Sequence, residues 1–185
     1  MRGDLKDNVR RTTFRMLQVR RGAGDRRRGW LTAGPLRVRV ALGRSGIAAN
    51  KREGDGATPA GRFRLRQVWW RPDRGFRPRT RLPVRRIGRS DAWCEDPTDR
   101  RYNRPIRLAT GAGGDRLWRQ DHLYDLIIEL DHNTRPRVAG RGSAVFVHLA
   151  RPGFTPTAGC VALHGSQLRR LLEGLSGKTE IAIHL

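Results

Sequence analysis

Short stretches in which apolar and charged residues alternate recur along this chain. Residues 36–40 alternate Leu and Val with Arg, and residues 62–68 repeat the pattern. Because successive side chains of a β-strand point to opposite faces, this period of two predicts half-buried strands. The apolar runs at residues 123–130 and 144–148 also predict strands. We therefore expect a mainly β fold, a sandwich or a barrel.

One stretch follows a helical period instead. Leu168, Leu171, Leu172 and Leu175 recur at spacings of three and four residues, which places them on one face of a helix. We expect this helix to end at Gly177. It is the one clear α-helix that the sequence predicts.

Residues 71–121 differ from the rest of the chain. They are rich in Arg, Pro, Asp and Gly and have few periodic apolar runs. A loop of this length inside a compact domain is unusual, so we expect it to pack over something functional, as a lid or insert. Residues 1–12 are polar and are expected to be a flexible N-terminus, which leaves residues 13–185 as a single domain.

The chain is strongly basic, with 39 Lys and Arg against 17 Asp and Glu and a net charge of +22. Such an excess is typical of polyanion binders. The arginines are spread along the whole chain, however, and no helix-turn-helix, zinc-ligand spacing or aromatic ribonucleoprotein motif accompanies them. These features disfavour nucleic acid as the partner. The alternatives are an acidic polymer of the cell wall, lipopolysaccharide, anionic lipid headgroups, or a solvated surface. No apolar run is long enough to span a membrane.

A histidine and a cysteine, His148 and Cys160, suggest the chemistry. His148 ends an apolar run, and Cys160 follows the small residues Ala158 and Gly159. A thiolate is a strong nucleophile, and an imidazole can take the thiol proton or rest beside the sulfur as an ion pair. The turn would let the backbone N–H groups of Gly159 and Cys160 form an oxyanion hole. The alternatives are a buried structural thiol, a core histidine, or a disulfide between Cys94 and Cys160.

Four segments in order carry a resemblance to a known family. They are residues 52–63 with their Thr-Pro-Ala-Gly-Arg-Phe run, residues 91–96, residues 102–105 and residues 143–163. Together they resemble the L,D-transpeptidase catalytic domain family of the YkuD type. The resemblance implies a β-rich fold, a thioester formed with peptidoglycan stem peptides, and no metal or organic cofactor. It also implies the roles of two side chains, with Cys160 as the nucleophile and His148 as the general base.

The resemblance also implies that a backbone carbonyl, supplied by the loop just after His148, orients the imidazole. Two positions depart from the family pattern: Ala158 replaces a histidine, and Ala162 replaces an arginine or asparagine. We therefore expect a divergent branch whose acyl donor or acceptor differs. We expect His164 to cap the helix or lie at the surface, and the alternative is that it supplies the missing imidazole.

The candidate substrate-binding residues are Tyr124, Trp93, Asp96, Tyr102, Asn103, Arg151 and Thr157. Those in residues 93–103 either shape a pocket or only pin the loop through local packing and hydrogen bonds. Strand alternation predicts that Tyr124 shares a face with His122 and Leu126, where it either flanks the cleft or packs in the core. Arg104 or Arg151 could hold a substrate carboxylate as a bidentate fork.

We therefore expect a peptidoglycan L,D-transpeptidase that cross-links stem peptides, with 3-3 and 1-3 cross-links both open. One alternative is a peptidoglycan L,D-carboxypeptidase or endopeptidase with the same site, and another is a non-catalytic polyanion- or wall-binding module. We expect a monomer that uses no metal. The resemblance implies a periplasmic protein, although the N-terminal residues show no apolar signal segment.

Overall fold

The computed structural model describes residues 13–109 and 115–185, so the expected flexible segment 1–12 lies outside the described residues. The elements in chain order are β1 (Met16–Arg21), β2 (Arg28–Ala33), β3 (Leu36–Ala41), β4 (Ile47–Ala48), β5 (Thr58–Pro59), β6 (Gly61–Trp70), β7 (Val84–Arg86), β8 (Asp91–Trp93), β9 (Pro105–Arg107), β10 (Asp115–Arg116), β11 (Leu126–Leu130), β12 (Phe146–Leu149), a short 3-10 helix (Pro152–Phe154), β13 (Val161–Leu163), α1 (Gly165–Glu173) and β14 (Glu180–Ile183). The prediction of a mainly β fold with one α-helix is confirmed.

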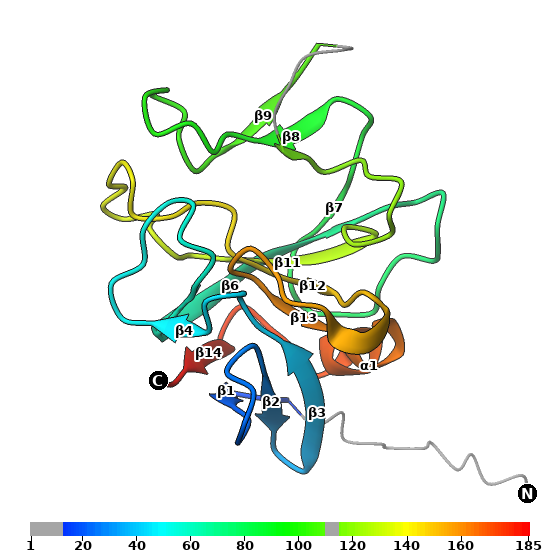
Figure 1. Ribbon diagram of the computed structural model, residues 1–185. Coiled ribbons are helices and arrows are strands. Elements are labelled where there is room, and N and C mark those ends of the chain that lie inside the picture. Colours follow the sequence, from blue (N-terminus) through cyan, green and yellow to red (C-terminus); the bar gives the residue numbers. More distant parts are fainter. Residues whose placement is uncertain (1–12, 110–114) are drawn as a thin grey trace, which may run out of the picture.

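The strands close into a barrel. Their order is β11-β12-β13-β3-β2-β1-β14-β6, and β6 also pairs with β11, which completes the ring. β6 is long enough to pair with β14 through its first residues, and with β11 and β7 through its last ones. Figure 1 shows β1, β2 and β3 at one side of the barrel and α1 beside β13.

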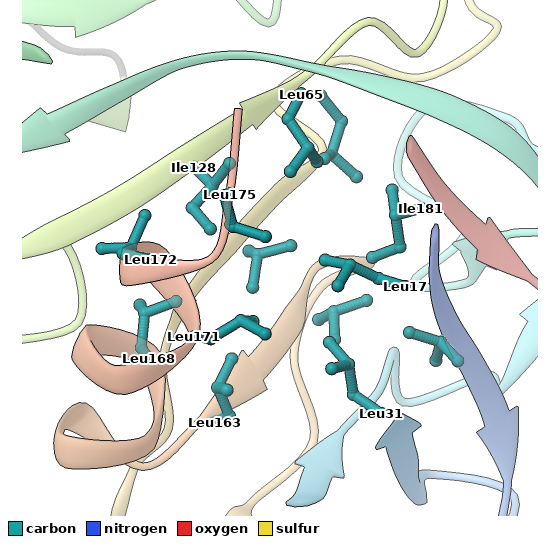
Figure 2. Packing of buried hydrophobic residues seen from close by; sticks show 14 of the residues in the cluster. Leu17, Leu31, Leu65, Ile128, Leu163, Leu168, Leu171, Leu172, Leu175 and Ile181 are labelled. Atoms are coloured by element: carbon teal, nitrogen blue, oxygen red, sulfur yellow. The ribbon is translucent and has the colours of Figure 1, made fainter. Parts of the chain in front are cut away.

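The barrel interior is filled with aliphatic side chains, among them Leu17, Leu31 and Ile181 (Figure 2). The four leucines predicted for one helix face are all fully buried against this core, and burying each one contributes about 2 kcal/mol. The helix itself stops at Glu173 with Gly174 as its C-cap. It therefore ends earlier than the predicted end at Gly177. It has nine residues, and no helix in the described ranges is long and apolar enough to cross a membrane.

The segment 71–121 was expected to form a lid or insert, and it is called the lid below as a label for that expectation. Its described part, residues 71–109 and 115–121, contains more regular structure than the sequence predicted. β7 joins the barrel, while β10, β8 and β9 form a separate three-stranded sheet, and Figure 1 shows β8 and β9 on the side of the barrel away from β1–β3. A second apolar cluster fills the space below the lid. It includes Trp69, Trp93 and Phe146, and the rings of Trp93 and Phe146 meet edge to face with centroids 5.0 Å apart.

The two clusters make β12 a strand that is buried on both faces. Val145 and Val147 belong to the barrel core, whereas Phe146 belongs to the cluster below the lid. Side chains alternate along a strand, so His148 shares the face of Phe146. The lid face of β12 is where the candidate site lies.

Candidate active site

His148 and Cys160 come together because β12 and β13 are parallel neighbours. Val147 is paired with Val161, so Cys160 is level with Phe146, two residues before His148. Alternate residues share a face, and the two side chains are therefore diagonal neighbours on the lid face of the sheet. Both line an open cavity of about 390 Å³.

The thiol of Cys160 is held by the backbone around the start of β12. It donates to the carbonyl oxygen of Ala144 at 3.2 Å, and the sulfur accepts from the N–H of Phe146 at 3.4 Å. Only 8% of the residue is exposed, and this burial raises the pKa of the thiol to about 12. Cys94 and Cys160 are both free thiols, so the disulfide alternative is not formed.

The imidazole of His148 is oriented by a backbone carbonyl. Its Nδ1 lies 2.8 Å from the oxygen of Leu149. Because a carbonyl oxygen only accepts hydrogen bonds, Nδ1 carries the proton and Nε2 keeps a lone pair. Burial lowers the pKa of His148 to about 4, and the ring of Tyr124 packs edge-on against it with centroids 5.4 Å apart.

These two pKa shifts set the resting state of the pair. Near neutral pH a thiol with a pKa of about 12 keeps its proton, and an imidazole with a pKa of about 4 stays neutral. Burial disfavours charge on either group. The arrangement favours a neutral base beside a neutral thiol over a resting ion pair.

The turn before Cys160 is built by hydroxyl groups. Thr157 Oγ1 donates to the carbonyl of Cys160 at 2.7 Å and accepts from the N–H of Gly159 at 3.1 Å. Thr58 Oγ1 donates to the same carbonyl at 3.4 Å. The N–H of Gly159 is therefore engaged by Thr157. The N–H of Cys160 makes no hydrogen bond to any residue in the described ranges, which leaves it the freer of the two candidate oxyanion donors.

Glycine is required at position 159 for two reasons. Its φ is +143°, a conformation that other residues rarely adopt, and a Cβ there would lie 2.8 Å from the carbonyl oxygen of Ala57. The backbone of residues 43–58 thus packs directly behind the turn that carries Cys160. The chain needs a residue without a side chain at this contact.

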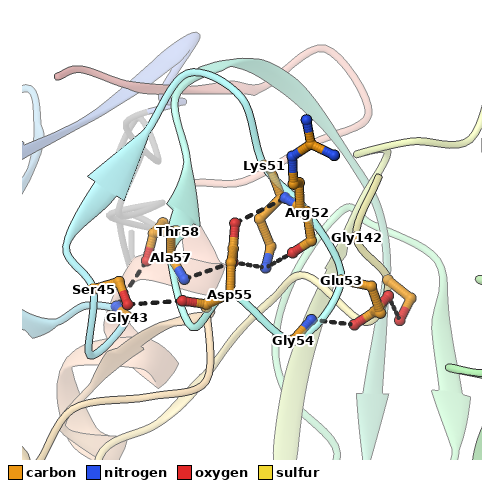
Figure 3. A network of polar contacts seen from close by, with 12 residues as sticks. Gly43, Ser45, Lys51, Arg52, Glu53, Gly54, Asp55, Ala57, Thr58 and Gly142 are labelled. Carbon is orange, nitrogen blue, oxygen red and sulfur yellow. Dashed lines mark hydrogen bonds and ion pairs between the residues drawn. The ribbon is translucent and has the colours of Figure 1, made fainter. Parts of the chain in front are cut away.

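Residues 43–58 hold their shape through the polar network drawn in Figure 3. Asp55 accepts from the backbone N–H groups of Arg52 and Ala57 and pairs with the buried ammonium of Lys51. Thr58 Oγ1 accepts from the N–H of Gly43 at 2.8 Å. These bonds fix the loop that supports the Cys160 turn.

Asn103 connects the lid to the thiol. Its Oδ1 accepts from Trp93 Nε1 at 3.0 Å and from the N–H of Ala144 at 3.2 Å, and its Nδ2 donates to the carbonyls of His132 and Asn133. Ala144 is the residue whose carbonyl receives the Cys160 thiol. Asn103 is only 4% exposed, so its amide holds both the lid and the backbone of the site.

The four lid candidates do not line the cavity that His148 and Cys160 share. Trp93 and Asn103 are buried residues of the lid, and Tyr102 donates its hydroxyl to Glu53 in a short hydrogen bond. Asp96 is exposed and accepts from the N–H and hydroxyl of Thr98. In the structure these residues make the local packing and hydrogen-bond contacts that were the alternative to lining a substrate pocket beside Cys160.

Tyr124, Arg151 and Thr157 do line the cavity, and Arg104 does not. The face predicted for Tyr124 was wrong, because the strand begins only at Leu126 and residues 122–125 form a turn. Tyr124 packs on Phe146 at the lid side, whereas Leu126 lies in the barrel core.

Neither of the remaining histidines considered from the sequence reaches the cavity. His164 occupies the N-cap position of α1 with no side-chain cap bond, is exposed, and pairs with Ser166 Oγ at 2.9 Å. It therefore does not replace the missing imidazole. His122 is exposed and contacts Arg74 and Asp125.

Sequence reasoning missed four charged residues on the cavity wall: Arg44, Glu95, Asp115 and Arg119. Arg119 forms ion pairs with Asp115 at 3.5 Å and Asp121 at 2.6 Å, and its guanidinium lies over the Tyr124 ring. Arg44, Glu95 and Arg119 lie in irregular segments, and Asp115 begins the two-residue strand β10, so no periodic pattern marks which of these side chains face inward.

A cysteine and a histidine line the wall of one open cavity, and a carbonyl orients the imidazole, which is an arrangement that cysteine acyltransferases use. The family model of the YkuD L,D-transpeptidase catalytic domain matches residues 8–183. The chain therefore belongs to this family, whose members are cysteine-dependent L,D-transpeptidases that act on peptidoglycan. No curated protein and no solved structure matches the chain.

Proposed function

We propose that this protein is a peptidoglycan L,D-transpeptidase that joins two stem peptides through a thioester on Cys160. The observation that carries the proposal is the shared cavity of Cys160 and His148, in which Nδ1 of the imidazole is bound to Leu149 and Nε2 is free to accept a proton. The family membership supports the same reaction.

In the first half-reaction, His148 Nε2 takes the thiol proton as the sulfur attacks a carbonyl carbon of the donor stem. The backbone N–H of Cys160 stabilises the oxyanion by a hydrogen bond. The N–H of Gly159 contributes a second hydrogen bond once it has left the hydroxyl of Thr157. The C–N bond then breaks, and the imidazolium gives its proton to the departing amine. The product is an acyl thioester.

In the second half-reaction, an amine of another stem attacks the thioester and loses a proton to His148. The C–S bond breaks, and the proton returns to the sulfur. Only the second nucleophile separates this reaction from hydrolysis. With water in place of the amine, the same site would be an L,D-carboxypeptidase or endopeptidase. Arg151, Tyr124 and Thr157 are the proposed substrate contacts, since they line the cavity.

The proposal is tested by incubating purified peptidoglycan with the protein and identifying the products. New cross-linked dimers, identified by mass spectrometry, are the expected product, and the bond between the stems distinguishes 3-3 from 1-3 links. Shortened stems without dimers would indicate the hydrolase. The Cys160→Ala variant is the matched control and should give neither product.

The net charge of +22 favours one further role, adhesion to an anionic polymer of the wall. We propose that the protein acts in the periplasm as a monomer, with this charge helping to retain it at its substrate. Binding to intact peptidoglycan sacculi should then weaken steeply with added salt. Tight, salt-sensitive binding without any covalent chemistry would favour a non-catalytic binding module instead.

A further inference from the structure

Cys160 lies where two cavities meet. The larger cavity, of about 390 Å³, also contains His148, and the smaller one, of about 190 Å³, extends toward Lys51 and Glu53. Five residues line both cavities and therefore surround their junction: Arg44, Glu95, Tyr124, Ala158 and Cys160. Arg44 and Glu95 are the two charged residues of this set.

The side chain of Arg44 is anchored, but its charge is not neutralised. Its Nη2 donates to the carbonyl of Gly54 at 3.1 Å, and its backbone N–H donates to the carbonyl of Thr157 at 2.9 Å. A Cβ at Gly56 would lie 2.6 Å from Arg44 Nε, so a glycine makes room for the guanidinium against this loop. Arg44 forms no ion pair with the residues that the structure describes. Its remaining N–H groups suit a carboxylate.

The carboxylate of Glu95 also has no partner, because it makes no hydrogen bond or ion pair within residues 13–109 and 115–185. Partial desolvation is the main cause that raises the pKa of Glu95 to about 7, and the negative charges of Asp115 and Glu53 add to it. The positive charges of Arg119 and Lys51 act in the opposite direction. A cation placed beside Glu95 would hold it ionised.

The other charged groups around the two cavities are already paired, which sets Arg44 and Glu95 apart. The pairs are Arg119 with Asp115 and Asp121, Arg151 with Asp121, Lys51 with Asp55, and Glu53 with Tyr102 and Ser143. The junction beside the thiol therefore offers one unpaired cation and one unpaired anion to a ligand.

We propose that Arg44 and Glu95 together bind a zwitterionic end group of the substrate, one carbon bearing both a carboxylate and an ammonium. Arg44 binds the carboxylate, and Glu95 binds the ammonium. This inference rests on the proposed function, because the diaminopimelate residue of a peptidoglycan stem carries this group at the end of its side chain. Both residues are then determinants of specificity that hold the stem beside Cys160.

Calorimetric binding of a synthetic diaminopimelate stem peptide tests the proposal. The protein carries Cys160→Ala to prevent turnover, and the buffer is above neutral pH so that Glu95 is ionised. The peptide is compared with two derivatives, one amidated at the side-chain carboxylate and one acetylated at the side-chain amine. In the parent protein, amidation of the carboxylate should weaken binding about tenfold, and acetylation of the amine should weaken it by a similar factor. Arg44→Gln should abolish the effect of amidation. Glu95→Gln should abolish the effect of acetylation. Arg52→Gln and Asp99→Asn, charges that line neither cavity, should bind as the parent does.

The proposal is overturned if the parent does not bind the unmodified peptide, or if both modifications weaken binding equally in the parent and in the two variants. Turnover by the wild-type protein is measured separately. Charge-specific binding without turnover would contradict the proposed function alone, and turnover without charge-specific binding would contradict the zwitterion site alone.

Discussion

The sulfur of Cys160 lies 3.2 Å from the carbonyl oxygen of Ala144, and the thiol donates its hydrogen to that carbonyl. The resting proton is thus held by the backbone at the start of β12. Attack on a substrate requires rotation of the S–H bond toward His148 Nε2. At rest the site therefore holds a protonated thiol near a histidine whose Nε2 is free to accept a proton.

The first prediction concerns the ionisation of Cys160. Because burial raises the pKa of its thiol to about 12, the free protein should show no thiolate at neutral pH. Ultraviolet thiolate absorbance, taken as the difference between wild type and Cys160→Ser, should rise only in strongly alkaline solution. A thiolate signal at neutral pH would reveal a resting ion pair and contradict this account.

The second prediction concerns stability in acid. The pKa of His148 is about 4 in the folded protein and about 6.5 without burial. Between pH 6.5 and pH 4 the unfolded chain binds a proton at this histidine that the folded protein does not bind. The free energy of unfolding is therefore highest above pH 6.5, and it falls as the pH drops toward 4. The loss amounts to about 3 kcal/mol.

Urea unfolding of wild type and His148→Gln at neutral pH and near the lower pKa measures this loss. Other groups titrate alike in both proteins, so the comparison isolates the histidine. The wild type should lose more stability than the variant. An equal loss in the two proteins would show that His148 is not held neutral by burial.

The third prediction concerns Asn103. Substitution by Ala removes the acceptor of two buried donors, Trp93 Nε1 and the N–H of Ala144. Leaving buried donors unpaired should cost about 2–3 kcal/mol of unfolding free energy. Asn103→Asp keeps the acceptor and should recover part of this loss in chemical denaturation. A variant Asn103→Ala as stable as wild type would mean that the lid does not depend on this amide.

The fourth prediction concerns Gly159. In Gly159→Ala the new Cβ would meet the carbonyl oxygen of Ala57 at 2.8 Å, so the turn must shift and the rate of Cys160 acylation should fall about a hundredfold. Gly153→Ala is the matched control, because Gly153 also has a positive φ, +73°, but has nothing near its Cβ position. Equal effects of the two substitutions would show that the contact with Ala57 is not what limits the site.

The sequence predicts the barrel strands because these depend on local patterns, and it predicts the roles of His148 and Cys160 because both residues lie in a segment that resembles a known family. Alternation along residues 36–40 and 62–68 marks half-buried strands, and the leucine period marks α1. The three-stranded lid sheet lacks such a pattern, because its strands have only two or three residues. Arg44 and Glu95 could not be chosen among the many charged residues, since only the folding of irregular segments brings them to Cys160.

The most direct test of the central claim is the intact mass of the protein after incubation with a stem-peptide donor. The account predicts a covalent acyl adduct on wild type that hydroxylamine removes, and no adduct on Cys160→Ala. His148→Gln should form the adduct far more slowly. An adduct that persists in Cys160→Ala, or product formation without any adduct on the wild type, would contradict a thioester mechanism at this cysteine.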